Sequence, residues 1–380
     1  MVAARKKQKT EAPPKHALEV LPEPLWRIVG KHVTDYDRVA FASTCRTFLE
    51  ALVEAGDPRK KGPLPLRTSL MDHKLMEQMP CFTLDWFQWV YHSFERKEGA
   101  AASQRFGSYS NHLYDADLLL VATFQGSKKA MKWLASQGIP LSIKCLRHET
   151  EEAVALAAAA AGGHVDVLDW LRSEGCKLDE SAYAGASCGG QLEVLQWLRS
   201  QNPPCPWNEN ACSYSAYEGH LHNLQWLRSQ DPPCPWNEST CAFAATGGRL
   251  GALQWLRSQD PPCPWDAKTC QHAAGGGELG VLKWARSQDP PCPWDVTTCS
   301  GAAWGGHLDV LKWLRSQDPP CPWDNGTSFY AASGGHLVAL QWLQSQDPPC
   351  PWNPENCKKE AESMGHQHVV EWIKETNSKQ

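Results

Sequence analysis

Apolar side chains in the C-terminal two thirds of the chain fall into short groups with helical spacing. In the segment 207–233, a stretch rich in Ala and Ser is followed by Leu221, Leu224 and Leu227. These leucines share one face of a helix, and Trp226 widens the apolar stripe. The pattern predicts two short helices in this segment, the second from about Leu221 to Ser229.

Residues that start and stop helices lie at the matching places. Asn208 precedes the first predicted helix and is a good N-cap. Gly219 follows that helix, and glycine accepts the left-handed conformation of a helix end. Pro232 and Pro233 follow the second helix, and proline lacks the amide donor that a helix needs. The segment therefore predicts a helix–turn–helix unit.

This unit is repeated with a constant step of 29 residues, from Cys205 to Cys234 and onward. A fixed period of this length indicates a solenoid, in which each unit packs on its neighbours. Positions that stay the same between units are expected to serve packing, and positions that change are available for recognition. The Cys-Pro-Trp sequence of each unit begins at Cys205, Cys234, Cys263, Cys292, Cys321 and Cys350.

Two further side chains recur with the unit. A tryptophan of the second helix extends the pattern back to Trp133, and its constancy favours a core position. An arginine follows it, and we interpret this series as a solvated face that could pair with the Asp of Asp-Pro-Pro. The 37-residue step from Trp133 to Trp170 predicts a longer loop around Ser142–Thr150, and Trp86–Phe94 fits the second helix of a degenerate unit. The arginines are Arg199, Arg228, Arg257, Arg286 and Arg315.

The repeated unit resembles an ankyrin repeat, as the segment Thr298–Leu314 shows best. Its Ala302-Ala303-Trp304-Gly305-Gly306-His307-Leu308 sequence matches the core of that motif. Two features depart from it: the unit is shorter, and Asp-Pro-Pro-Cys-Pro-Trp replaces the usual loop. The resemblance therefore supports a helical stack over 113–376 but leaves a protruding β-hairpin in doubt.

Variation between units concentrates on the first helix and at the position that follows Ala-Ala. In ankyrin proteins this position commonly faces the concave groove, so the resemblance points to a binding role. Drift at positions that packing tolerates is the alternative. The candidate groove residues are Tyr214, Tyr217, Phe243, Thr246, His272, Trp304, Tyr330 and Ser333.

The N-terminal third has a different composition. Residues 1–16 carry five basic residues among Ala and Pro, which predicts a disordered tail, and Arg5–Lys9 could be a nuclear signal. Residues 17–56 predict a pair of amphipathic helices joined by a turn at Thr34–Asp37. Residues 57–112 are assigned to a linker and the degenerate unit.

The segment 17–56 resembles an F-box, through its Leu-Pro opening and the Ser43–Phe48 stretch Ser-Thr-Cys-Arg-Thr-Phe. The resemblance implies docking on a Skp-family adaptor of a cullin–RING ubiquitin ligase. A helical hairpin that merely caps the stack is the alternative. The residues expected to contact the adaptor are Leu21, Pro22, Leu25, Ile28 and Val33.

Sixteen cysteines invite a disulfide or metal interpretation. Equivalent cysteines of successive units would be about 8–10 Å apart, beyond the limit of about 7 Å between Cα atoms for a disulfide. A bridge within a unit, between Cys205 and Cys212, remains geometrically open. The Cys-x6-Cys spacing is unlike structural zinc sites, and Ser328 replaces one cysteine. Buried, reduced thiols are therefore expected, with no metal and no cofactor.

Other features narrow the function. The net charge of −5 argues against a broad nucleic-acid surface. Apolar runs are too short for a membrane span, and the charged N-terminus does not resemble a signal peptide. The His of Gly-His-Leu is replaced by Gln, Arg or Glu in other units, so it is expected to act at the helix start. No catalytic constellation recurs in a constant frame.

Together these patterns predict an all-α fold, an α-solenoid of short ankyrin-like units preceded by a small helical F-box-like domain. The expected function is non-enzymatic: a substrate receptor of a ubiquitin ligase, cytoplasmic or nuclear, with an unknown protein target on the concave face. An ankyrin-type scaffold without a ligase link is the alternative.

Overall fold

The computed structural model describes residues 81–93, 96–97, 113–142, 144–147 and 150–377. By its internal contacts the chain divides into two compact units, Met1–Ala155 and Leu156–Gln380. The boundary falls inside the segment 113–376, which the repeat pattern assigns to one array.

The described part of the first unit is mainly helical. Helix α6 (Asp115–Phe124) is apolar from Leu118 to Ala122, and Leu118 and Leu119 are buried. Phe87 on the first helix and Leu134 on the third are also fully buried. The helix predicted over Trp86–Phe94 is confirmed. The helices are α5 (Leu84–Ser93), α6 (Asp115–Phe124) and α7 (Lys128–Ser136).

Two short sheets accompany these helices. Strand β1 (Arg96–Lys97) pairs in parallel with β2 (Leu113–Tyr114). Strand β3 (Lys144–Arg147) pairs with β4 (Thr150–Ala153) in an antiparallel ladder. This hairpin lies where the sequence predicted a longer loop, so that prediction was incomplete.

The second compact unit, Leu156–Gln380, is a helical solenoid, as predicted. Each repeat in it contributes two helices, here called helix A and helix B. Helix A of one repeat packs against helix A of the next and against its own helix B. Helix A is α8 (Val154–Ala161), α10 (Glu180–Cys188), α12 (Glu209–Glu218), α14 (Glu238–Thr246), α16 (Ala267–Gly275), α18 (Val296–Trp304), α20 (Asn325–Ser333) and α22 (Pro354–Ser363). Helix B is α9 (Val165–Ser173), α11 (Leu192–Arg199), α13 (Leu221–Ser229), α15 (Leu250–Arg257), α17 (Leu279–Arg286), α19 (Leu308–Arg315), α21 (Leu337–Gln344) and α23 (Gln367–Asn377).

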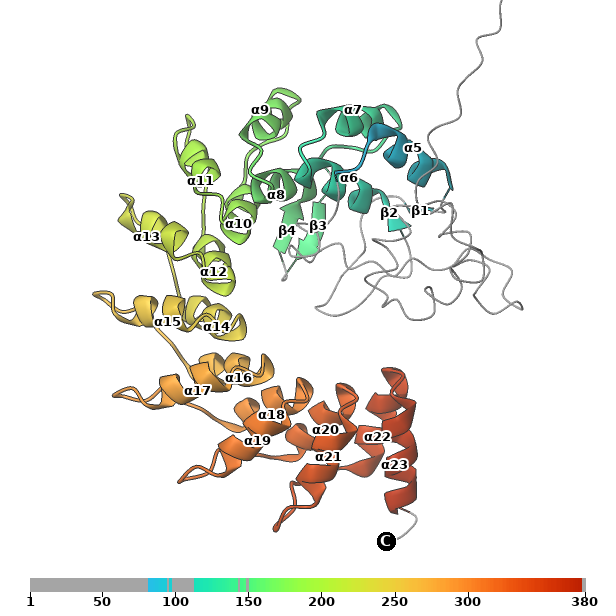
Figure 1. Ribbon diagram of the computed structural model, residues 1–380, viewed down its shortest axis with the longest axis vertical. Helices are drawn as coiled ribbons and strands as arrows, with labels where there is room; N and C mark the ends of the chain where they lie inside the picture. Colours follow the sequence, from blue (N-terminus) through green and yellow to red (C-terminus); the bar gives the residue numbers. More distant parts are fainter. Residues whose placement is uncertain (1–80, 94–95, 98–112, 143, 148–149, 378–380) are drawn as a thin grey trace, which may run out of the picture. The chain divides into compact units, whose positions relative to one another are not determined.

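The two kinds of helix form two layers within this unit. Helix A lies on the inner side of the curved stack, and helix B lies on the outer side with its loops extending outward (Figure 1). Helix A is rich in small residues, and Ala244 and Ala245 are fully buried. Helix B buries a narrow stripe, of which Leu224 and Leu227 are examples. Small side chains on helix A allow the close stacking of successive units.

The predicted caps are present. The Asn208 side chain accepts a hydrogen bond from the backbone N–H of Asn210, and Gly219 ends α12 with φ +80°. In other units a pair of glycines follows helix A, and the two glycines are required for different structural reasons. A Cβ on Gly247 would lie 2.0 Å from the Tyr217 carbonyl oxygen, whereas Gly248 has φ +68°. The first glycine thus permits close approach and the second permits the turn.

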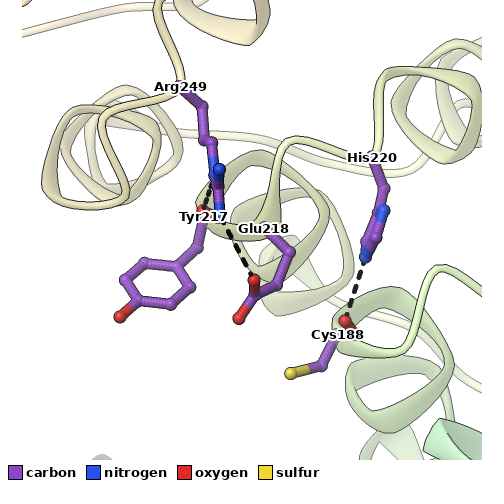
Figure 2. A network of polar contacts seen from close by, with 5 residues as sticks. All are labelled: Cys188, Tyr217, Glu218, His220 and Arg249. Atoms are coloured by element: carbon purple, nitrogen blue, oxygen red, sulfur yellow. Dashed lines mark hydrogen bonds and ion pairs between the residues drawn. The ribbon is translucent and has the colours of Figure 1, made fainter. Parts of the chain in front are cut away.

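The residue before helix B links one unit to the preceding one. His220 Nε2 lies 3.1 Å from the Cys188 carbonyl oxygen, so this ring nitrogen donates. Arg249 Nε donates to the Tyr217 carbonyl at 3.1 Å (Figure 2). Carbonyls at a helix end lack intrahelical donors, and these side chains supply them. The predicted role at the helix start was wrong: this side chain caps the preceding unit's helix A rather than its own helix B.

Candidate protein-binding site

Two exposed aromatic rings mark the helix-A layer. Trp304 at the end of α18 is 51% exposed, and Tyr330 on α20 is 45% exposed. Within the described residues, Val338 and Met364 are the other large hydrophobic side chains with comparable exposure. Large exposed aromatic side chains are typical of contact surfaces, because they bury much area with few rotatable bonds.

A third ring adds to this region. Phe329 is half-buried, and its ring centroid lies 5.6 Å from that of Tyr330 in an edge-on arrangement. The sequence marked this pair as variable, but only Tyr330 was chosen as a candidate. The neighbouring ring supports Tyr330 from one side, so a partner would meet two aromatic groups at this place.

A second aromatic group lies on α12 and α14. The ring of Phe243 is 5.8 Å from that of Tyr214 and 6.2 Å from that of Tyr217. Tyr217 and Phe243 are partly exposed, but Tyr214 is only 4% exposed and belongs to a buried cluster with Ala184 and Cys188. Tyr214, which was expected in the groove, therefore lies in the interior, where its ring packs edge-on against Phe243.

The polar candidates are tied to their neighbours. Thr246 Oγ1 donates to the Ala242 carbonyl at 3.0 Å and lies 2.8 Å from His272 Nδ1. Because the hydroxyl has one proton, His272 Nδ1–H donates to it. Burial lowers the pKa of His272 below its usual value. Ser333 is buried, and its hydroxyl donates to Glu360 Oε1 at 3.2 Å, so it too lies away from the surface.

We use the term helix-A surface for the candidates that remain at least partly exposed. Their relative positions follow from the 29-residue period, since each unit places its variable residues at the same end of helix A. The helix-A surface consists of Tyr217, Phe243, Thr246, His272, Trp304 and Tyr330.

A polar network secures the backbone beneath one part of this surface. Arg249 Nη2 lies 3.5 Å from Glu218 Oε2, while its Nε donates to the Tyr217 carbonyl. Figure 2 shows both contacts, with the Tyr217 ring turned away from the guanidinium group. The network fixes the end of α12 and with it the direction in which Tyr217 leaves the helix.

The opposite layer is built from a repeated three-part contact. The Arg257 guanidinium lies 4.2 Å from the ring centroid of Trp265, and its Nη1 donates to the Cys263 carbonyl at 2.6 Å. The ring of Trp284 meets Trp265 edge-on at 6.0 Å. The same contact recurs in the neighbouring units for Arg228, Arg286 and Arg315.

This contact corrects two sequence-based interpretations. In these four units the arginine is not a solvated residue that pairs with Asp, because it stacks on tryptophan and donates to a backbone carbonyl. Arg199 also stacks on a tryptophan, Trp207, but donates to the carbonyl of Asp231 in Asp-Pro-Pro at 3.2 Å. The helix-B tryptophans are half-buried rather than central, as Trp255 illustrates. The constant eight-residue spacing between arginine and tryptophan was the available signal.

The remaining candidate chemistry can be placed only in part. The candidate adaptor-binding residues lie outside the described residues. In the described part of the chain the cysteines that repeat with the unit are free thiols, and no group of three or more His, Cys, Asp or Glu side chains could hold a metal ion. The adaptor candidates are Leu21, Pro22, Leu25, Ile28 and Val33.

Comparison with known proteins does not assign the chain to a family. No family model matches the chain, and a search of the curated proteins finds no significant match. None of the described helices has the length and apolar character needed to cross a membrane.

Proposed function

We propose that this chain is a non-enzymatic receptor that binds a protein target on the helix-A surface. The observation that carries the proposal is the exposure of Trp304 and Tyr330, 51% and 45%, on a layer whose packing is otherwise repeated from unit to unit. Aromatic side chains of this kind contribute much of the binding energy at protein interfaces.

The arrangement of the surface supports a protein rather than a small molecule. Its residues come from several successive helices, α12 to α20, so one partner would extend across several units. Extended concave surfaces of this kind are how repeat proteins hold their partners. The likeness of Thr298–Leu314 to an ankyrin repeat supports the same proposal.

For the N-terminal region we propose an F-box over residues 17–56, on the strength of the sequence resemblance. It would dock on a Skp-family adaptor of a cullin–RING ubiquitin ligase, in the cytoplasm or nucleus. The chain would then act by proximity, because a tethered target has a raised local concentration at the ligase.

Target binding is tested by affinity capture with the full chain and two surface variants. Trp304→Ala and Tyr330→Ala are expected to lose the target at least tenfold, because each removes exposed aromatic area. Val338→Ala is the matched control, since Val338 is 65% exposed but lies on helix B. Equal loss for all three variants, or for none, would contradict the assignment of the surface.

Adaptor binding is tested by co-elution of the full chain with a purified Skp-family adaptor. Leu21→Asp and Ile28→Asp are each expected to abolish co-elution, because a charge in an apolar interface is desolvated without a partner. Trp304→Ala should co-elute normally. If wild type fails to co-elute, or both Asp variants still do, the F-box assignment is wrong and the scaffold alternative is favoured.

A further inference from the structure

Buried cysteines lie in pairs, and each pair joins two successive units. One member lies on helix A, and the other begins the Cys-Pro-Trp sequence of the next unit, 22 residues later. Cys212 Sγ is 4.0 Å from the carbonyl oxygen of Cys234, and the corresponding distance in the next three pairs is 3.8 Å. All eight side chains are fully buried. The thiol pairs are Cys212–Cys234, Cys241–Cys263, Cys270–Cys292 and Cys299–Cys321.

Within the first pair, the Cys212 thiol donates to the Cys234 carbonyl, and the Cys234 thiol donates to the Asn208 carbonyl at 3.4 Å, one turn before Cys212 on α12. The neighbouring thiol of the pair, together with burial, raises the pKa of Cys234, Cys263, Cys292 and Cys299 above the usual value for a thiol. These four thiols are therefore protonated and slow to react while the units are closed, since the thiolate is the reactive form.

The distance limit that excludes bridges between equivalent cysteines does not apply to these pairs. A disulfide needs Cβ atoms about 3.5–4.5 Å apart and an S–S bond of about 2.05 Å. Each helix-A sulfur already lies 3.8 to 4.0 Å from the backbone carbonyl of its partner cysteine, so the two side chains need only a local movement to reach that bond. The two members occupy different places in their units, one on helix A and one in a loop, so the stacking distance of the helices does not separate them.

The next unit provides a natural comparison. Ser328 stands where the other units have the helix-A cysteine, and Cys350 takes the place of the second thiol, 22 residues later. Ser328 is fully buried and Cys350 is nearly so. Gln344 replaces the arginine here and donates to Ser328 Oγ at 3.1 Å, but the position on helix A is equally buried, and a hydroxyl cannot form a disulfide. It therefore separates the role of packing from the role of redox chemistry.

We propose that the four thiol pairs are sites of reversible disulfide formation that join successive units of the array under oxidising conditions. The oxidant is a peroxide. One thiolate attacks a peroxide oxygen, and with hydrogen peroxide this gives a sulfenic acid and one water. The partner thiol then attacks the sulfenic sulfur, forms the S–S bond and releases a second water. Two electrons pass from the two sulfurs to the peroxide, and a small dithiol returns them on reduction.

The expected consequence is a stiffer array. Each bond would join helix A of one unit to the Cys-Pro-Trp loop of the next unit. Four consecutive junctions would then be cross-linked, from α12 to the loop that contains Cys321. Because the sulfurs are fully buried, the oxidant reaches them only when a loop opens. The pairs would then respond to sustained oxidation, and exposed cysteines such as Cys81 would react first.

The proposal is tested by peptide mapping of the full chain. Reduced protein is treated with hydrogen peroxide in native buffer, alkylated in denaturant and digested without reductant. We expect four cross-linked peptides, one for each thiol pair, a raised midpoint of urea unfolding, and return of both signals after dithiothreitol. Cys350 should be alkylated as a free thiol.

Two variants sharpen the result. Ser328→Cys should add a fifth link, to Cys350, and Cys234→Ser should remove only the first link while the other three form. The proposal is overturned if the pairs stay unlinked in folded protein while Cys81 is oxidised. It is also overturned if the links found join other cysteines, such as Cys205 with Cys212.

Discussion

The two layers of the solenoid differ in how much they vary. On the helix-B side the same arginine, tryptophan and cysteine carbonyl meet in successive units, with guanidinium-to-ring distances from 3.8 to 4.2 Å. On the helix-A side the equivalent position holds Tyr217, Thr246, Gly275, Trp304 and Ser333, which range from buried to half exposed. One layer repeats a single packing solution, and the other presents a different side chain in each unit.

This difference separates stability from recognition within one repeat. The contacts that hold successive units together involve backbone carbonyls, small residues and the Arg–Trp stack, and they leave the Trp304 side chain largely exposed. A change there alters the surface without altering the stack.

Trp255→Ala should lower the free energy of unfolding by about 2 to 3 kcal/mol, whereas Trp304→Ala should change it by less than about 0.5 kcal/mol. Trp255 is half-buried against Trp236, with ring centroids 6.3 Å apart, so the loss is below that of a fully buried tryptophan. Trp304 is 51% exposed. Urea unfolding of both variants decides the matter, and equal losses would remove the distinction between the layers.

The helix pattern was predictable from the sequence because its signals are local. The N-cap at Asn208, the stop at Gly219 and the bounds Leu221–Ser229 follow from residue types whose backbone preferences act within one turn. The β3–β4 hairpin was not predicted, because its two four-residue strands show no alternation of apolar and polar residues.

The candidate surface was predictable only in part, since variation between units does not report burial. Tyr214 and Ser333 vary as Trp304 does, yet both are buried by neighbouring units. The Arg257 stack on Trp265 was missed because the loop between them must fold back to bring them together. Such contacts depend on tertiary structure, which the spacing alone does not determine.

Asn223→Val should raise the free energy of unfolding by about 1 to 2 kcal/mol, because a buried polar group without a partner is costly. Asn223 is fully buried on α13, and neither its amide nitrogen nor its oxygen has a hydrogen-bond partner in the structure. It interrupts a buried stripe that has Val194 at the equivalent place of the preceding unit.

The reciprocal variant, Val194→Asn, is the matched control for this prediction and should destabilise by a similar amount. Both are measured by urea unfolding under the same conditions. If Asn223→Val has no effect or destabilises, then Asn223 contributes more to this layer than its surroundings indicate.

Acidification should weaken the helix-A side through His272. Burial lowers the pKa of His272 in the folded state, so the unfolded chain binds the proton more readily. The contribution of this residue to stability is therefore complete above about pH 6.5, the usual pKa of histidine, and is lost as the pH falls below it.

His272→Gln should flatten the dependence of the urea midpoint on pH between 7 and 5. The corresponding change in the free energy of unfolding should be smaller than that of Asn223→Val. Burial also lowers the pKa of His336, so part of the slope should remain. An unchanged slope in the variant would show that His272 titrates equally in the folded and unfolded chain.

Gln344→Arg should stabilise the array by about 0.5 to 1 kcal/mol, the smallest of the four effects. Gln344 occupies the place of the stacked arginines, and its Nε2 donates to the Cys350 carbonyl at 3.1 Å, but it cannot place a cation over Trp352. There the ring of Trp352 is tilted 44° to Trp372, whereas the corresponding pair in the preceding unit is at 70°. Arg315→Gln is the reciprocal control and should lose a similar amount. If urea unfolding shows that neither variant differs from wild type, the Arg–Trp stack follows from the packing of this layer and does not stabilise it.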